Sequence, residues 1–143
     1  MSELNHMHMV FRAEIQFPPK DDEMGLFDEY LSELIDRIGM EVLLGPYTTY
    51  HYETGNRGLT SISAIKTSHI TAHVWDECNP AILQLDVYSC KMFNVNEVVE
   101  WIHEHFGVIK GHYMLIDRNH DIIPFQLQNG VVPPSIDLQK ELG

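Results

Sequence analysis

Three short apolar runs separated by turn sequences constrain the fold of this chain more than any other feature. The runs cover residues 59–65, 70–75 and 81–88, and they are rich in β-branched and aromatic residues. Residues 76–80, which end in Asn-Pro, have the composition of a hairpin loop. Strands joined by so few residues pair antiparallel, because a parallel pair needs a long crossover. The segment therefore predicts consecutive antiparallel strands.

The rest of the chain adds further strands and two helices. Strands are expected over residues 8–17, 41–52 (interrupted at Gly45-Pro46) and 108–116. One amphipathic helix is expected from a cap at Asp21 or Asp22 to about Ile38, where Gly39 closes it. A second is expected from near Asn94, with Glu97 completing a capping box and Gly107 ending it.

This order of elements predicts an α+β fold in a single domain over residues 1–143. We expect a two-layer α/β sandwich, with a mostly antiparallel sheet and both helices on one face. The other face must then stay polar or be covered, and a dimer contact is one way to cover it. The tail after Gln126 is expected to be extended or loosely ordered.

Charge and composition exclude several classes of function. The 143 residues contain nine basic and twenty-one acidic residues, a net charge of -12, which argues against nucleic-acid binding. No apolar run is long enough to span a membrane, and the N-terminus does not have the pattern of a secretory signal. Cys78 and Cys90 are spaced neither as a zinc site nor as a redox pair, so we expect a reduced, cytoplasmic protein.

The histidines form two His-x-His pairs, at residues 6 and 8 and at residues 103 and 105. On a strand such a pair shares one face and can bind a metal ion, whereas on a helix the two side chains point apart. No further ligand stands at a helpful spacing. We therefore expect no metal site.

A serine, a histidine and a thiol are brought onto neighbouring strands by this pattern. Alternation along 70–75 places Thr71, His73 and Trp75 on one face, opposite Ile70, Ala72 and Val74. If 70–75 and 81–88 pair around the 76–80 loop, Cys90 lies close to Ser68. Taken singly, each residue has an ordinary structural explanation, because a lone strand cysteine is usually a small buried apolar group.

Together these residues resemble the core of the prokaryotic S-adenosylmethionine decarboxylase proenzymes, over about residues 8–117. The family pattern of Gly-x-Ser/Thr, Ser-His and a following His-x-Trp with a nearby Glu is matched at consistent spacing. The matching residues are Gly58, Thr60, Ser68, His69, Ile70, Thr71, His73, Trp75 and Glu77, followed by Leu85-Asp86-Val87-Tyr88-Ser89-Cys90.

The resemblance implies that the chain cleaves itself between Thr67 and Ser68 and converts Ser68 into a pyruvoyl cofactor. His73 would remove the Ser68 α-proton, and Thr60 would stabilise an intermediate through its hydroxyl. The pyruvoyl group would form a Schiff base with the substrate amine, and Cys90 would return a proton to the substrate α-carbon. Thr67 stands where the family has Glu.

The resemblance also implies S-adenosylmethionine as substrate, for spermidine synthesis, and a homodimer of processed pairs of chains. Trp75 and Tyr52 would stack on adenine, and Glu77 would bind the ribose hydroxyls. Two alternatives stay open. One is a pyruvoyl-dependent arginine or ornithine decarboxylase, and the other is an unprocessed, non-catalytic homologue. Thr67 and the loop at 76–80 motivate the first alternative, and Thr67 motivates the second.

Overall fold

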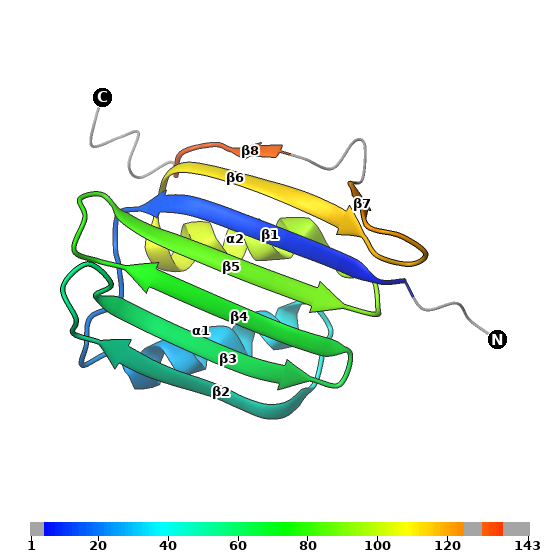
Figure 1. Ribbon diagram of the computed structural model, residues 1–143, viewed down its shortest axis with the longest axis horizontal. Coiled ribbons are helices and arrows are strands. Elements are labelled where there is room, and N and C mark those ends of the chain that lie inside the picture. Colours follow the sequence, from blue (N-terminus) through cyan, green and yellow to red (C-terminus); the bar gives the residue numbers. More distant parts are fainter. Residues whose placement is uncertain (1–4, 125–129, 136–143) are drawn as a thin grey trace.

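A computed structural model of the chain describes residues 5–124 and 130–135, which form one layer of strands and one of helices (Figure 1). The elements are β1 (Met7–Ile15), α1 (Met24–Arg37), β2 (Val42–His51), β3 (Gly58–Ile65), β4 (Ser68–Trp75), β5 (Ala81–Ser89), α2 (Val95–Phe106), β6 (Val108–Asp117), β7 (Ile123–Pro124) and β8 (Gly130–Val132). The predicted α+β class is confirmed. The short strands β7 and β8 were not predicted.

The sheet has the strand order β2-β3-β4-β5-β1-β6-β7, and β8 pairs with β6. Every pairing is antiparallel. Strands β2 to β5 follow one another as hairpins, as the turn sequences predicted. Strand β1 lies between β5 and β6 and so joins the two halves of the sheet (Figure 1).

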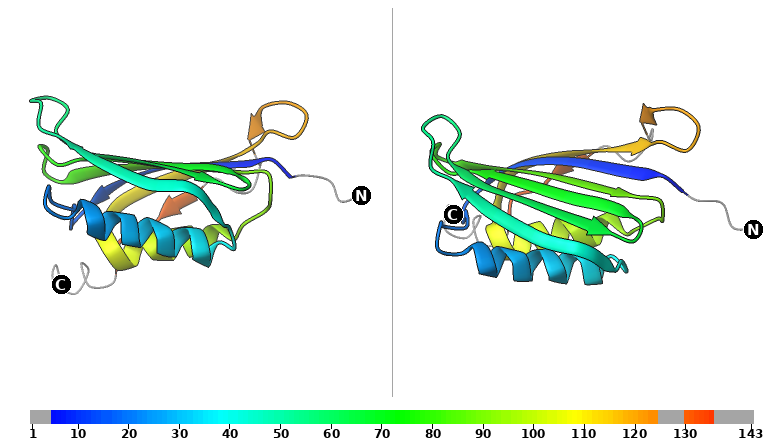
Figure 2. Two further views of the ribbon diagram at one scale, coloured as in Figure 1. Left: turned by 90° about the horizontal axis from the view of Figure 1, so that it is seen from below. Right: turned by 60° about the horizontal axis from the view of Figure 1, so that its bottom comes forward.

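Both helices cover the same face of the sheet, as predicted (Figure 2). Helix α1 buries Phe27, Leu31, Leu34 and Ile35, and α2 buries Val98, Trp101, Ile102 and Phe106. These side chains pack on the buried side of the strands, which includes Met9, Ala13, Ile70, Ala72, Val74, Leu83, Leu85 and Val87. Within residues 5–124 and 130–135, no helix lies on the opposite face of the sheet, and we call it the open face (Figure 2).

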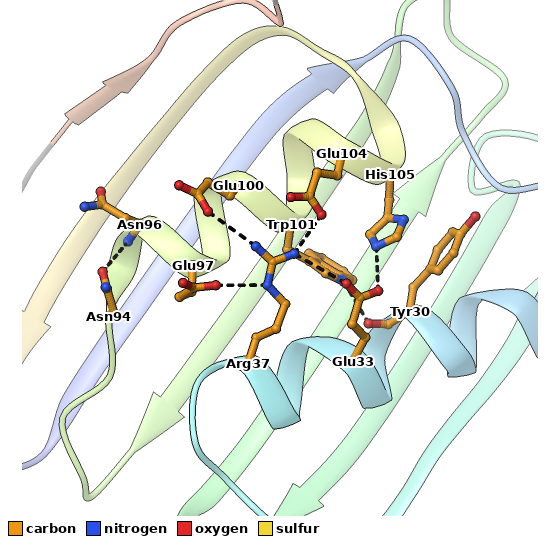
Figure 3. A network of polar contacts seen from close by, with 10 residues as sticks. All are labelled: Tyr30, Glu33, Arg37, Asn94, Asn96, Glu97, Glu100, Trp101, Glu104 and His105. Carbon is orange, nitrogen blue, oxygen red and sulfur yellow. Dashed lines mark hydrogen bonds and ion pairs between the residues drawn. The ribbon is translucent and has the colours of Figure 1, made fainter.

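Arg37 forms hydrogen bonds that link the two helices (Figure 3). Arg37 on α1 donates hydrogen bonds to Glu97 at 2.9 Å and Glu104 at 2.7 Å, both on α2, and lies 3.4 Å from Glu100 and from Glu33. The hydrogen bonds to Glu104 and Glu97 raise the pKa of Arg37 above its usual value. One cation therefore offsets the repulsion among four carboxylates.

The expected helix caps are wrong in two places. Helix α1 begins after Glu23, rather than at Asp21 or Asp22. The Glu23 side chain does not cap the helix, because its carboxylate accepts the backbone N–H of Lys20. At α2 the side chain of Asn94 does cap the helix, by accepting the N–H of Asn96 at 2.9 Å. Glu97 bonds to Arg37, so no capping box forms there. Gly39 and Gly107 end the helices as predicted, both with positive φ.

The part of the tail that the structure describes is the short strand β8 and residues 133–135, while residues 127–129 and 136–143 lie outside the described residues. In the described part of the chain, neither helix has the length and apolar composition needed to cross a membrane.

Candidate functional site

Ser68 begins β4 directly after a two-residue turn. Ile65 pairs with Ser68, so Lys66 and Thr67 alone connect β3 to β4. Ser68 has a φ of 141°, and among the described residues it is the one non-glycine with a positive φ. A residue held in such a sparsely populated backbone region stores on the order of 1–3 kcal/mol of strain. The strain lies in the backbone of Ser68, directly after the peptide bond that joins it to Thr67.

The carbonyl of that peptide bond is held by Cys90. The backbone N–H of Cys90 donates to the Thr67 oxygen at 2.8 Å, one residue beyond the pairing of Ser68 with the buried Ser89. The proximity of Ser68 and Cys90 expected from the hairpin is therefore confirmed. At this end of the strand, the Thr67 hydroxyl donates a hydrogen bond to the Met40 sulfur at 3.0 Å. An N–H aimed at a carbonyl oxygen polarises it and stabilises an oxyanion formed there.

Thr60 and His73 form a second pair at the other end of the hairpin. They are direct partners in the β3–β4 register, and Thr60 Oγ1 lies 3.0 Å from His73 Nδ1. The His73 ring stacks against Trp75, with ring centroids 5.6 Å apart. Both side chains lie on the open face, as alternation along 70–75 predicted. The hydroxyl and the imidazole are thus positioned for proton transfer.

Gly58 makes the close approach of β3 to β4 possible. Its φ is 145°, and a Cβ built on it would lie 1.7 Å from the carbonyl oxygen of Val74. No side chain fits there, which is why this position needs glycine. Two residues after Gly58, Thr60 is set opposite His73.

A cavity of about 360 Å³ opens beside this pair, and its polar lining includes His51, Asn56, Thr60, His73 and Trp75. Trp75 Nε1 donates to Asn56 Oδ1 at 3.0 Å. Both Glu77 oxygens accept the Gly55 N–H at 3.0 Å, so Glu77 holds the 53–57 turn against the end of β4.

The structure does not bring Tyr52 to Trp75. Tyr52 packs on Tyr50, with ring centroids 4.8 Å apart, and its hydroxyl donates to Asp21 at 3.2 Å. Loss of solvation and the nearby Asp21 raise the pKa of Tyr52. Burial and a hydrogen bond to Asp76 raise the pKa of Tyr50 to about 12. The hydroxyls of both tyrosines thus donate to acidic side chains, Tyr50 to Asp76 and Tyr52 to Asp21.

Within one chain the structure keeps His73 and Thr60 away from Ser68. His73 lies five residues beyond Ser68 along β4. At about 3.3 Å per residue, this places the two roughly 16 Å apart. One chain therefore holds two separate pairs, Ser68 with Cys90 and Thr60 with His73.

The open face also carries polar contacts for which the sequence predicted no role. His8 Nε2 lies 2.9 Å from Asp86 Oδ1, and His6 Nδ1 lies 2.8 Å from the Tyr88 hydroxyl. Arg118 lies over the Tyr88 ring at 4.1 Å. The hydrogen bond from His8 holds the pKa of Asp86 below its usual value, and the nearby His69 and His73 act in the same direction. The His-x-His spacing of residues 6 and 8 was the signal in the sequence that could have indicated these contacts, because it places both histidines on one face of the strand.

Among the described residues, Glu33, Glu104 and His105 have ligand atoms within 4.8 Å of one another, between α1 and α2 (Figure 3). Each already has a partner there. Glu104 accepts from Arg37, and Glu33 lies 2.8 Å from His105 Nε2. Exposed acidic groups often gather in this way without binding an ion, and we assign no metal to them.

Comparison with known proteins gives one family. The family described as S-adenosylmethionine decarboxylase matches residues 21–119, a range that contains both pairs and the 53–57 turn. No curated protein matches the chain.

Proposed function

This chain belongs to the S-adenosylmethionine decarboxylase family, and from that premise we propose that it cleaves itself before Ser68 and decarboxylates S-adenosylmethionine with the pyruvoyl group so formed. The family supports decarboxylation of S-adenosylmethionine as the general activity. The observation that carries the finer proposal is the strained Ser68, whose preceding carbonyl accepts the Cys90 N–H at 2.8 Å.

Maturation begins when the Ser68 hydroxyl oxygen attacks the Thr67 carbonyl carbon. The Cys90 N–H, already on that carbonyl oxygen, stabilises the negative charge that develops. The bond to the Ser68 nitrogen breaks, the nitrogen takes the hydroxyl proton, and an ester remains. Breaking this bond also releases the backbone of residue 68 from its strained φ. Thr67 in place of Glu leaves this step intact in principle, because the attacked group is a backbone carbonyl.

A base must then remove the Ser68 α-proton. Its loss expels the Thr67 carboxylate from the Ser68 Cβ and leaves dehydroalanine, which hydrolyses to the pyruvoyl group and ammonia. His73 suits the role of base, and Thr60, 3.0 Å from its Nδ1, orients the ring. Because His73 lies five residues along β4 from its own Ser68, the base must come from elsewhere. We assign it to the partner's His73 in a homodimer.

The open face supports such a dimer, because it exposes apolar side chains at its β2–β3 corner. Leu44, Tyr47 and Ile62 are 60%, 62% and 54% exposed, and Tyr47 pairs directly with Ile62. Apolar side chains grouped on an uncovered sheet face favour association. A second copy on this face would cover them and could bring its Thr60–His73 pair to the Ser68–Cys90 end.

In the finished enzyme, the pyruvoyl group supplies an electron sink for the substrate carbon that loses carbon dioxide. Cys90, held beside residue 68 by the β4–β5 register, returns a proton to that carbon. Trp75 offers an aromatic face to the adenine, and Glu77 offers a carboxylate to the ribose. For Tyr52 to join them, its hydroxyl has to leave Asp21.

We place the enzyme in polyamine synthesis, as a source of the aminopropyl donor for spermidine. We also propose a cytoplasmic location, which suits two free thiols, Cys78 and Cys90.

The test is intact mass together with carbon dioxide release. Wild-type protein should separate into chains 1–67 and 68–143, and Ser68→Ala should remain whole. Labelled S-adenosylmethionine, arginine and ornithine are then assayed side by side. If only arginine or ornithine releases carbon dioxide, the proposed substrate is wrong and the proposed cofactor stands. Wild-type protein that stays whole after long incubation would make it an unprocessed homologue.

A further inference from the structure

The cavity beside Thr60 and His73 has a polar wall that the family motif does not include. This wall is the 53–57 turn, and Asn56 is its residue that lines the cavity. His51 lines it too, from the end of β2. The described residues that line this cavity include no carboxylate, so it is unsuited to the distal cation of arginine or ornithine. It is suited to an uncharged ring with hydrogen-bonding edges.

Asn56 is held in a fixed orientation. Trp75 Nε1 donates to Asn56 Oδ1 at 3.0 Å, which determines which amide atom is the oxygen. The turn around it is fixed at both sides, because Gly55 N–H binds the Glu77 carboxylate and Arg57 donates to Asp76 at 2.7 Å. A group ordered in this way before the ligand arrives loses little entropy on binding.

The amide keeps further hydrogen-bonding capacity. Within the described residues, the Asn56 Nδ2 hydrogens have no hydrogen-bond partner, and Oδ1 has a second lone pair. A donor and an acceptor side by side match the edge of adenine that carries the N7 acceptor and the N6 amine. Guanine and hypoxanthine have an acceptor oxygen in place of that amine, so the same amide discriminates against them.

From this geometry we propose that Asn56 recognises the adenine of S-adenosylmethionine, donating from Nδ2 to N7 and accepting at Oδ1 from the N6 amine. The inference rests on the proposed function and adds a specificity-determining residue to it. Trp75 has two roles here, since its ring offers the adenine a face and its N–H sets the orientation of Asn56.

The experiment compares S-adenosylmethionine with its 7-deaza analogue, which lacks the N7 acceptor, on wild type and Asn56→Ala. The wild-type kcat/KM should fall for the analogue by about tenfold to a hundredfold, the range for one bidentate amide–base contact. Asn56→Ala should show a similar loss with S-adenosylmethionine and little further loss with the analogue. Thr54→Ala is the control, because Thr54 is exposed in the same turn and does not line the cavity. Intact mass of each variant shows whether processing is unchanged.

Equal sensitivity of wild type and Asn56→Ala to the missing N7, or a variant within twofold of wild type, would overturn the inference. If the wild-type protein releases no carbon dioxide, the proposed function fails, and binding alone decides the role of Asn56. Calorimetry with 5′-methylthioadenosine and its 7-deaza form would then be used. Binding that depends on both N7 and Asn56 supports the inference, and absence of nucleoside binding overturns it as well.

Discussion

At the Ser68 end of β4 the contact to the carbonyl before Ser68 is made by the backbone, whereas at the Trp75 end the contacts of Thr60, His73 and Trp75 are made by side chains. The Thr67 carbonyl is held by the Cys90 N–H, and Ser68 itself has a φ of 141°. At the other end Thr60 contacts His73, His73 stacks on Trp75, and Trp75 bonds to Asn56. A strained φ at Ser68 needs the rigid backbone of a sheet to hold it, whereas proton transfer and ligand recognition depend on side chains.

This difference has a consequence for substitutions. Side-chain changes at the Trp75 end should remove a function and leave the fold, because no ladder hydrogen bond depends on them. At the Ser68 end, side-chain changes should leave the polarised carbonyl in place, because the donor is a backbone N–H.

The largest effect is expected when the two ends are placed on different chains. Ser68→Ala and His73→Ala should each remain whole when expressed alone. In cells that express both in equal amounts, about half of the His73→Ala chains should be cleaved, because random pairing places half of them in mixed dimers and each mixed dimer has one complete site, at the Ser68 of the His73→Ala chain. The Ser68→Ala chains should stay whole, which mass spectrometry resolves directly. No cleavage in the mixture would mean that each chain uses its own His73.

Cys90→Ala separates the two roles assigned to this residue. Cleavage should continue at a rate within about tenfold of wild type, because the substitution keeps the backbone donor to the Thr67 carbonyl. Decarboxylation should fall by about a hundredfold or more, the usual loss when a positioned acid is removed. The measurements are cleavage half-time and carbon dioxide release. A variant that never cleaves would assign the thiol to maturation instead.

Gly58→Ala should disturb the Trp75 end through the backbone. Its Cβ would meet the Val74 carbonyl oxygen at 1.7 Å, and β3 and β4 must separate to accept it. We expect a loss of about 1–3 kcal/mol in the free energy of unfolding, measured by urea titration. Gly55→Ala is the matched control, since a Cβ there has no heavy atom within 4 Å although φ is also positive. Equal losses in both variants would attribute the effect to φ alone.

Ser68→Gly and Ser68→Ala measure the strain at the Ser68 end without cleavage. Glycine adopts a φ of 141° freely and alanine does not. Ser68→Gly should therefore be the more stable of these two uncleavable proteins, by about 1 kcal/mol after the greater flexibility of unfolded glycine is subtracted. Urea unfolding of both proteins gives the difference. Equal stability would show that residue 68 is unstrained.

The smallest effect concerns Asp86, which lies between the two ends and contacts His8 at 2.9 Å. The His8 hydrogen bond lowers the pKa of Asp86 in the folded chain. The stabilisation is therefore present above the carboxyl's usual pKa, near 4, and is lost as pH falls through the lower folded value. Wild type should lose more stability than Asp86→Asn between about pH 5 and pH 2. Parallel urea midpoints over that range would contradict the prediction.

The sequence predicted the sheet and the Ser68 end well because both depend on local signals. Alternation in residues 70–75 and a short loop at 76–80 were enough to pair β4 with β5 and bring Cys90 to Ser68. The strain at Ser68 could not be predicted, because it comes from a two-residue turn held between two ladders. Two expected caps were wrong. Helix α1 begins after Glu23 rather than at Asp21 or Asp22, and the Glu97 carboxylate bonds to Arg37 of the other helix, a tertiary contact that local spacing does not indicate.

The Trp75 end was predicted less well. Trp75 and His73 were placed on one face correctly, but Tyr52 was expected beside Trp75 and instead contacts Tyr50 and Asp21. The contact that holds the Tyr52 hydroxyl comes from Asp21, 31 residues earlier in the chain. Spacing along the sequence contains no information about such long-range contacts. The separation of His73 from Ser68 follows from their positions five residues apart on the same strand, β4.

The strand order has a consequence for a chain cut between Thr67 and Ser68. The first piece would carry β1, α1, β2 and β3, and the second would carry β4, β5, α2 and the strands after it. Because β1 lies between β5 and β6, and β3 lies beside β4, the two pieces alternate across one sheet and share three ladders. Neither piece has a complete hydrophobic core alone. Once unfolded, the cut protein could regain its structure only by a bimolecular encounter, so its recovery after denaturation should depend on concentration, whereas refolding of the uncut chain should not.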